Sequence, residues 1–322
     1  MRRLFAGLTA GVFLLVSTAC GSSGGGSSKA GESSGGITTV KVGLIPIVDV
    51  APLYLGEKKG FYEKQGLKLS PTLAAGGAAI VPGVASGQYQ FGFSNVFSLM
   101  LAQSHNVPVK AISNGVASTG SQGKDFGAAL VKKDSSVKTA KDLEGKKVAV
   151  NTLKNIVELS MRASVKKAGG DPDKVSFVEI PFDQMPAALD KGQVDAAMAV
   201  EPALTTIKDQ GGREIASPLV DVAPELTVAM YFTSTRYAQQ NPDVVKKFRT
   251  ATAESLAYAN THPDEVRQIV TTYTKVPSSV LAKVTLPKWP AEANRASIEA
   301  QEKLGQEFGF FKKTPDLDTL LP

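Results

Sequence analysis

Hydrophobic positions in the first half of the chain follow strand-like and helix-like patterns in turn. Val40, Val42 and Leu44 belong to a β-rich stretch over 40–45, and Leu67 and Leu69 flank a polar residue as in a half-buried strand. Further strands are expected at 90–93 and 107–112, with helices at 78–85 and 96–103. An apolar stretch over 51–55 leads to a turn at Gly60. Strands that alternate with helices indicate a mainly parallel sheet flanked by helices.

A second series of the same kind begins near residue 128. Strands are expected at 129–131, 147–150, 175–180 and 194–200, and helices at 156–167, 185–189 and 203–208. The C-terminal part reads as mostly helical. Helices should start at Asn241-Pro242-Asp243 and at His262-Pro263-Asp264, because proline fits the first helical turn and an acid favours the positive helix end. A last helix is expected at 291–308.

One stretch of the first series is echoed in the second. Residues 84–91 resemble residues 189–196, about 105 positions later. In both, a short helix ends at glycine, a strand follows, and the chain reaches a polar corner, Ser94-Asn95 in one and Glu201-Pro202 in the other. Two lobes of similar design are therefore expected, each presenting strand ends to a common cleft, where open α/β sheets bind ligands.

The N-terminal segment has the pattern of an export signal. Two arginines precede an apolar run over 4–16, shorter than the roughly 20 residues that a spanning helix needs. Cys20 follows small residues and resembles the lipidated cysteine of bacterial lipoproteins, although Ser17 stands where leucine is most frequent. Gly and Ser make up 13 of the 16 residues over 21–36, as in a flexible coil. We expect a signal peptide over 1–19 and a lipidated tether over 20–36; a plain secreted protein is the alternative.

Composition narrows the classes of function. The 322 residues, 43% of them apolar, suffice for two buried cores. Loss of Arg2 and Arg3 with the signal would leave 34 basic against 30 acidic residues, so the net charge falls from +6 to +4 and nucleic acid is not an expected partner. One Cys and two His leave little material for metal sites. No P-loop or nucleophile elbow occurs, and no cofactor is expected.

Four stretches of the chain carry the motifs of a known family. They are Val42-Gly43 with Ala51-Pro52-Leu53 and Gly60-Phe61-Tyr62; Gly76-Gly77 with Ser86-Gly87 and Phe91-Gly92; 142–149; and 187–189 with 192–196 and Glu201-Pro202. Through them the sequence resembles the solute-binding lipoproteins of bacterial ABC importers that serve nitrate, taurine, aliphatic sulfonates and thiamine-precursor pyrimidines. The resemblance runs from about residue 39 to about residue 235.

The resemblance implies an α/β protein with a type II periplasmic-binding-protein fold. In this fold two α/β lobes are joined by two crossover strands, and the ligand cleft lies between the lobes. Lobe one would comprise 37–115 plus 222–322, and lobe two 126–220. The crossovers are expected near 114–126 and 216–227, which are rich in small residues, Gly or Pro.

Three polar corners are candidates for holding the ligand. Helix N-termini offer unpaired N–H groups and a positive dipole end, which suit oxyanions such as sulfonate. The corners are Gly76 and Gly77, Ser94 and Asn95, and Thr152 with Asn155. The family resemblance implies a ligand contact near Asn155. Plain helix capping by Ser, Thr and Asn is the alternative explanation for each corner.

Two acidic residues argue against a bare oxyanion as the ligand. The resemblance places Asp49 where lobe one touches ligand, and Glu201 in a recurring acid–proline pair. Two carboxylates would repel a bare anion but suit an ammonium or amidine-like group, as in taurine or an aminopyrimidine. The alternative for Glu201 is a structural acid in a first helical turn. Phe126 and Phe182 are candidates for a stacking wall, with core packing as the alternative.

The resemblance implies an extracytoplasmic receptor that captures a small polar organic solute and delivers it to the permease and ATPase of an ABC importer. Lipidated Cys20 would anchor it to the outer face of the cytoplasmic membrane, and a monomer is expected. A biosynthetic enzyme of a pyrimidine or quinone pathway on the same fold, or a solute sensor, are the alternatives. An enzyme is not expected, since Cys20 belongs to the export segment and leaves no cysteine nucleophile.

Overall fold

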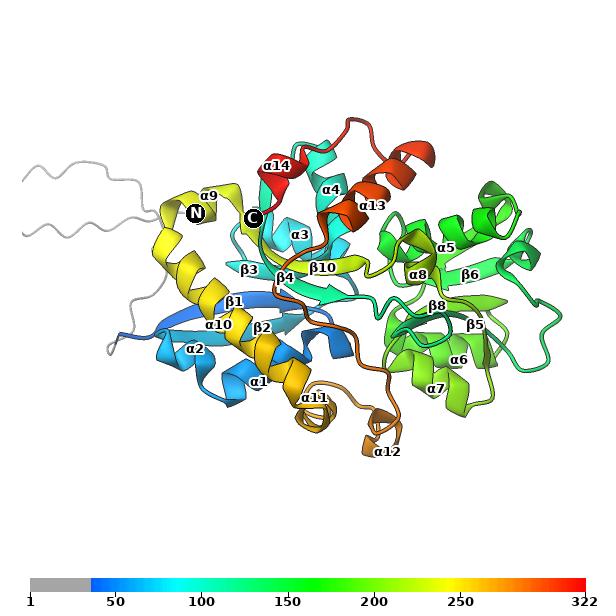
Figure 1. Cartoon of the computed structure of the whole chain (residues 1–322), viewed down its shortest axis with the longest axis horizontal. Helices are drawn as coiled ribbons and strands as arrows, with labels where there is room; N and C mark the ends of the chain where they lie inside the picture. The colour runs from blue at the N-terminus through cyan, green and yellow to red at the C-terminus, as the bar shows by residue number, and fades with distance from the viewer. Residues whose placement is uncertain (1–35) are drawn as a thin grey trace, which may run out of the picture.

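The computed structural model describes residues 36–322 and consists of two α/β lobes, each built on a five-stranded sheet (Figure 1). The expected signal peptide and Cys20 lie outside the described residues, as does the tether before Gly36. The first sheet has the strand order β2 (Leu67–Leu73), β1 (Thr38–Leu44), β3 (Phe91–Asn95), β10 (Thr227–Ser234), β4 (Val109–Ala117). The second has the order β7 (Ser176–Glu179), β6 (Lys147–Val150), β8 (Ala196–Val200), β5 (Gly127–Val131), β9 (Arg213–Ala216).

Helices cover both sheets. Those of the first lobe are α1 (Ala51–Lys58), α2 (Phe61–Lys64), α3 (Gly77–Ala85), α4 (Val96–Ser104), α9 (Thr235–Gln240), α10 (Pro242–Thr261), α11 (Pro263–Val270), α12 (Ser278–Leu281), α13 (Arg295–Glu307) and α14 (Leu317–Leu320). Those of the second are α5 (Ile156–Lys167), α6 (Met185–Asp190), α7 (Ala203–Asp209) and α8 (Pro218–Val222). Short 3-10 turns lie at Val48–Val50, Ala140–Leu143, Pro172–Lys174 and Phe182–Gln184.

The predicted starts of α10 and α11 are confirmed, with one difference in their caps. Both helices begin at a proline with an acid in the first turn. Neither Asn241 nor His262 caps with its side chain: the amide of Asn241 donates to the carbonyl of Tyr237, and the ring of His262 lies against the carbonyl of Tyr258. Each of the two side chains is therefore bonded to a carbonyl of the preceding helix and does not cap the helix that follows it.

Each sheet contains a strand that runs antiparallel to its neighbours, whereas the alternating pattern predicted a mainly parallel sheet. β1 pairs in parallel with β2 and β3, whereas β10 runs antiparallel between β3 and β4. β5 likewise runs antiparallel between β8 and β9. Both antiparallel strands are entered directly from the other lobe, without the crossover helix that a parallel connection needs. All eight residues of β10 are buried, so this strand forms the centre of the first core.

The chain crosses between the lobes at residues 118–126 and 217–226. The two crossings are hydrogen-bonded to each other, because the N–H of Ser118 donates to the carbonyl of Leu226 over 2.9 Å and the N–H of Gly123 donates to the hydroxyl of Ser217 over 2.7 Å. In the first crossing Asp125 is buried, and its carboxylate accepts from the hydroxyl of Ser118 over 2.7 Å.

A third segment passes between the lobes after α12, and we call residues 282–294 the strap (Figure 1). At its start Lys283 forms an ion pair of 2.8 Å with Asp209 of the second lobe. Further on, Lys288 pairs with Ala117 at the end of β4. The strap then leads into α13, which packs against α5 and α8 of the second lobe. The C-terminal part of the chain therefore contacts both lobes.

The echo noted in the sequence has a matching geometry in the two lobes. Gln90 exchanges two hydrogen bonds with the backbone of Lys41, of 2.8 and 3.0 Å. Asp195 exchanges the same two with the backbone of Lys147, both of 2.8 Å. The preceding glycines, Gly87 and Gly192, are left-handed with φ of 83° and 67°. The same pair of hydrogen bonds, between the start of one strand and a residue of the neighbouring strand, therefore occurs in each sheet.

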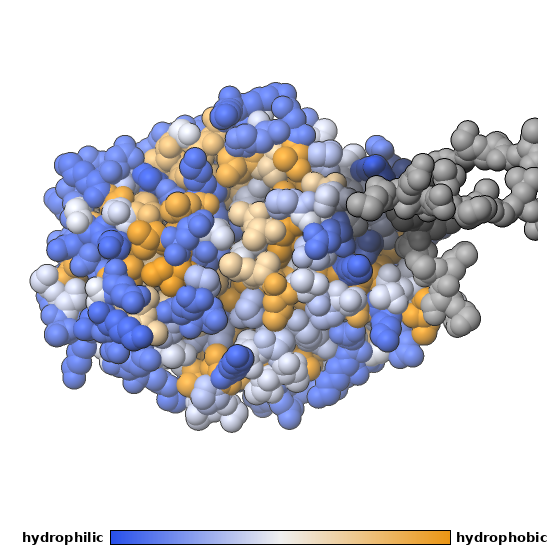
Figure 2. Space-filling model, turned by 180° about the vertical axis from the view of Figure 1, so that it is seen from behind, coloured by the Kyte–Doolittle hydropathy of each residue, from blue (hydrophilic) through white to orange (hydrophobic). Residues whose placement is uncertain are grey.

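The surface is mostly hydrophilic, with apolar side chains in patches between charged ones (Figure 2). The exposed large hydrophobic residues of the described chain are Ile37, Leu73 and Leu153. Within residues 36–322, no helix combines the length and the apolar character needed to cross a bilayer.

Candidate functional site

A small cavity lies between the two lobes. Its volume is about 30 Å³, room for about two water molecules. The polar residues in its wall are Asp49, Asn95, Asn151 and Asn155, two from each lobe. Apolar side chains make up the rest of the wall, among them Ile45, Ile47, Phe93, Phe182 and Val200. The ends of β1, β3, β6 and β8 meet there, as the strand-end argument predicted.

Asp49 is the ionisable residue of this wall. It lies in the 3-10 turn before α1 and is only 3% exposed. Its Oδ1 has no hydrogen-bond partner within the described chain. Burial raises the pKa of Asp49 to about 7; a backbone hydrogen bond opposes this rise and the charge of Asp125 adds to it. A buried acceptor without a hydrogen-bond partner lowers the stability of the fold. This oxygen is therefore available to accept a hydrogen bond from a ligand.

The loop that carries Asp49 is held from three directions. The indole Nε1–H of Trp289, in the strap, donates to the carbonyl of Asp49 over 3.0 Å. The hydroxyl of Tyr273 donates to the carbonyl of Ile47, also over 3.0 Å. From the second lobe, the carbonyl of Glu201 accepts from the N–H of Val48 over 3.2 Å. Segments far apart in the sequence therefore fix the position of the carboxylate.

Two asparagines form the wall on the second lobe. Asn155 caps α5, because its Oδ1 accepts from the N–H groups of Val157 and Glu158 over 3.0 and 3.2 Å. Its Nδ2 donates to Oδ1 of Asn151 over 2.7 Å. Asn151 in turn donates to the carbonyl of Ala75 in the first lobe over 3.1 Å. The pair thus connects the cap of α5 to the opposite lobe.

Gly76 brings the backbone of the first lobe against the second. A Cβ at this position would lie 2.7 Å from Nδ2 of Asn151 and 3.0 Å from Cγ2 of Thr152. Any larger residue at position 76 would therefore push the lobes apart. The neighbouring Gly77 serves packing within the first lobe, since a Cβ there would lie 2.1 Å from Oγ of Ser94.

Glu201 lies beside the cavity and does not line it. Its side chain is fully buried, and the carboxylate accepts from the N–H and hydroxyl of Thr205 over 3.0 and 2.8 Å and from the N–H of Thr285 over 3.0 Å. Burial raises the pKa of Glu201, and these hydrogen bonds oppose the rise. Glu201 thus joins α7 to the strap, the structural role weighed as an alternative for it.

The candidate ligand residues fall into three groups. Four of them line the cavity: Asp49, Asn95, Asn155 and Phe182. Gly76 and Thr152 form the contact between the lobes. The others, Gly77, Ser94, Phe126 and Glu201, are buried outside the cavity wall.

Two functional positions were missed by the sequence argument. Asn151 directly precedes the predicted corner with Thr152 and Asn155, but it was not among the candidates. Trp289 was not a candidate either, whereas its indole N–H holds the backbone of Asp49. The flanking prolines at 287 and 290 are a signal of an extended segment, but nothing local indicates its distant partner.

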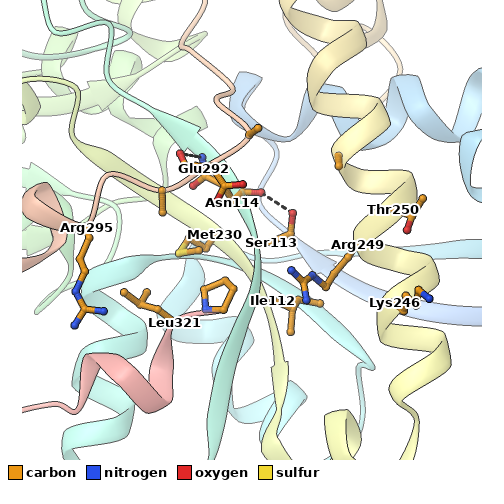
Figure 3. A pocket seen from close by; sticks show the side chains of 14 residues that line it. Ile112, Ser113, Asn114, Met230, Lys246, Arg249, Thr250, Glu292, Arg295 and Leu321 are labelled. Atoms are coloured by element: carbon orange, nitrogen blue, oxygen red, sulfur yellow. Dashed lines mark hydrogen bonds between the residues drawn. The ribbon is translucent and has the colours of Figure 1, made fainter.

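A larger cavity of about 500 Å³ lies on the first lobe alone (Figure 3). Ile112 and Ser113 of β4 and Met230 of β10 line it, and α10 contributes Lys246 and Arg249. The strap and the chain end complete its wall. Movement of the lobes would not open or close this cavity, and it brings together none of the ten candidate residues.

The inter-lobe cavity is suited to hydrogen bonding. Its wall combines one carboxylate and three carboxamides with apolar side chains. In the part of the chain that the structure covers, no three His, Cys, Asp or Glu side chains gather where they could hold a metal ion. The arrangement can enclose and orient a small polar molecule between two lobes that are joined by two crossings.

Known proteins resemble this chain in sequence. The taurine-binding periplasmic protein of Escherichia coli (strain K12) is 28% identical over 188 residues, 58% of this chain and 56% of that protein. The chain therefore matches little more than half of that relative's length. A 4-amino-5-hydroxymethyl-2-methylpyrimidine phosphate synthase of Aspergillus parasiticus is 21% identical over 226 residues, 66% of this chain and 64% of that protein.

The fold is shared with a solved binding protein. The alkanesulfonate-binding protein SsuA from Xanthomonas axonopodis pv. citri, solved with bound MOPS, has a TM-score of 0.74 at 16% identity. The match covers 88% of this chain and 98% of that one. The periplasmic-binding-protein fold expected from the sequence is thereby confirmed.

A family model described as "NMT1/THI5 like" matches residues 47–266. This range contains both sheets except β1, and it contains all the polar residues of the inter-lobe cavity. The family predicted from the sequence motifs is confirmed by this match and by the relatives. The chain belongs to the NMT1/THI5-like family.

Proposed function

We propose that the protein is an extracytoplasmic receptor that captures a small polar organic solute between its lobes and delivers it to the permease of an ABC importer. The observation that carries this proposal is the inter-lobe cavity, whose polar wall comes equally from both lobes. Residues 118–126 and 217–226 act as the hinge. A cavity of about 30 Å³ admits a solute only if the lobes first separate, so capture is coupled to opening and closing.

The receptor is tested by binding. Thermal unfolding of the purified protein is followed against taurine, alkanesulfonates, nitrate, aminopyrimidines and aromatic acids, and native mass spectrometry identifies any solute that co-purifies. A solute that binds the folded state raises the melting temperature, and above Kd the added stability grows with the logarithm of the solute concentration. Absence of any shift, together with absence of a co-purified solute, would contradict the proposal.

The second candidate is an enzyme on the same fold, which the similarity to the pyrimidine phosphate synthase favours. The receptor is preferred because the cavity wall combines carboxamides and apolar groups around one carboxylate, a set suited to holding a solute. Incubation of a bound solute with the protein, followed by mass spectrometry, separates the two. An unchanged solute supports the receptor, and a product supports the enzyme.

We further propose that Cys20 carries lipid and anchors the receptor to the outer face of the cytoplasmic membrane, with residues 21–36 as its tether. The small residues before Cys20 and the Gly/Ser composition after it support this proposal. Metabolic labelling with an alkyne fatty acid should mark the protein, and Cys20→Ala should abolish the label. Equal labelling of the variant would contradict lipid attachment at Cys20.

A further inference from the structure

At the helix N-termini beside the cavity, side chains occupy one N–H group of α4 and two N–H groups of α5. Oδ1 of Asn95 accepts from the N–H of Ser98 over 2.7 Å, which caps α4. Oδ1 of Asn155 accepts from two N–H groups of α5. A sulfonate or nitrate bound at a helix N-terminus would need these same donors. The two caps therefore leave fewer free N–H donors for an oxyanion in the cavity.

The charge around the cavity is also unfavourable for an anion. Within residues 36–322, the cavity wall contains no Lys, Arg or His, and its one ionisable side chain is Asp49. Asp125 adds negative potential, as its effect on Asp49 shows. The carboxylate of Asp125 itself accepts from the hydroxyl of Ser118 and from the N–H groups of Thr119 and Phe126. A bare anion would enter a buried site with no cation to pair it.

The unsatisfied polar groups point to the opposite kind of ligand. Oδ1 of Asp49 is a buried acceptor without a partner in the described chain, and Asp49 is more than nine-tenths buried. The second orphan near the lobe contact is Oγ1 of Thr152, a hydroxyl that can accept as well as donate. Thr152 lies at the lobe contact and not in the cavity wall, whereas Asp49 lines the cavity and would be satisfied by a ligand that supplies an N–H group.

We propose that the solute presents a nitrogen-bearing donor to Asp49, in the form of an ammonium, an amidine or an aromatic amine, and that the site rejects molecules whose only polar group is an oxyanion. This inference rests on the proposed receptor function and narrows its solute class. Asp49 is the specificity-determining residue: its carboxylate pairs with the donor, and the apolar wall around Phe93 and Phe182 excludes water from the pair.

The test uses two pairs of molecules that differ in one amino group and one pair of aromatic molecules of opposite charge. Taurine is compared with ethanesulfonate, 4-aminopyrimidine with pyrimidine, and benzamidine with toluene-4-sulfonate as a cationic and an anionic aromatic. Isothermal titration on the unaltered protein should show at least a tenfold lower Kd for the nitrogen-bearing member of any pair that binds. This comparison does not depend on how a variant folds.

Asp49→Asn is the matching variant, with Asp190→Asn as a control on an exposed carboxylate of α6. Asp49→Asn should lose at least tenfold in affinity for the nitrogen-bearing solute, and Asp190→Asn should bind as the unaltered protein does. Amine-free anions that bind equally tightly, with or without Asp49, would overturn this inference and leave the receptor function standing. A panel without any binder would contradict the receptor function itself, and the inference with it.

Discussion

Replacing Asp49 by asparagine should stabilise the unliganded protein, because it removes a charge that the fold buries at a cost. The carboxyl is 3% exposed and one of its oxygens has no partner in the described chain. Burial raises its pKa from 3.8 to about 7, helped by the charge of Asp125. The substitution keeps the shape of the side chain and removes its charge, so its effect on stability must depend on pH.

The sign follows from proton binding by the two states. Between pH 4 and pH 7 the folded protein retains a proton on Asp49 that the unfolded chain has lost, so the free energy of unfolding falls as pH rises. The slope is about 1.4 kcal/mol per pH unit, which amounts to about 4 kcal/mol above pH 7. Below pH 3.8 both states are protonated and the difference disappears.

We therefore expect Asp49→Asn to raise the free energy of unfolding by up to about 4 kcal/mol at pH 8, and by less than about 1 kcal/mol at pH 4. Urea unfolding at both pH values measures this, followed by circular dichroism and by the fluorescence of Trp289, the single tryptophan of the chain. Trp289 reports directly on the region, since its indole is bonded to the backbone of Asp49.

Asp190→Asn, at an exposed carboxylate, serves as the control and should change the free energy of unfolding by less than about 0.5 kcal/mol at either pH. The reasoning would be refuted if Asp49→Asn destabilised the protein at pH 8, or if it stabilised it equally at pH 4 and pH 8. Either result would mean that the carboxylate is not an uncompensated buried charge.

Three further substitutions test how the site is built. Gly76→Ala should lower solute affinity at least tenfold with little change in melting temperature, because its Cβ would meet Asn151 and hold the lobes apart. Isothermal titration measures the affinity and small-angle scattering measures the separation of the lobes, with the exposed substitution Ala79→Ser as control. Trp289→Phe keeps an aromatic ring but loses the bond to Asp49, and should cost about 1 kcal/mol in urea unfolding and weaken solute binding. Asn155→Ala removes the cap of α5 and should cost about 1–2 kcal/mol while also lowering affinity, whereas unchanged affinity would remove Asn155 from the site.

Local patterns predicted the elements that depend on local chemistry. The apolar runs of β1, β6 and β8 are buried strands, and the proline–acid pairs do start α10 and α11. β10 was not recognised, because it follows a crossing between lobes and no helix–strand alternation marks it. A strand within an alternating series of strands and helices can therefore be predicted from the sequence more readily than a strand that follows a crossing from the other lobe.

The sequence predicted which residues at strand ends line the site, but not the distant contacts that hold the site together. Asp49, Asn95 and Asn155 follow strands whose ends must face a common cleft, and they do line it. The partners of Glu201 and Trp289 could not be foreseen, since Glu201 meets a residue 84 positions away and Trp289 one 240 positions away. No local pattern encodes such pairings, which arise from the packing of the whole chain.

The strap also has a consequence for the order of folding. The turn that carries Asp49 lies near the start of the described chain, yet its backbone is held by Tyr273 and Trp289, 226 and 240 positions away from the residues they bind. Contacts of such long sequence separation form late and slowly, because a large loop must close first. A chain shortened before the strap would leave this turn without the hydrogen bond from Trp289. The cleft is therefore completed only when nearly the entire polypeptide is present, so that solute capture belongs to the finished chain and not to any folding intermediate of the first lobe.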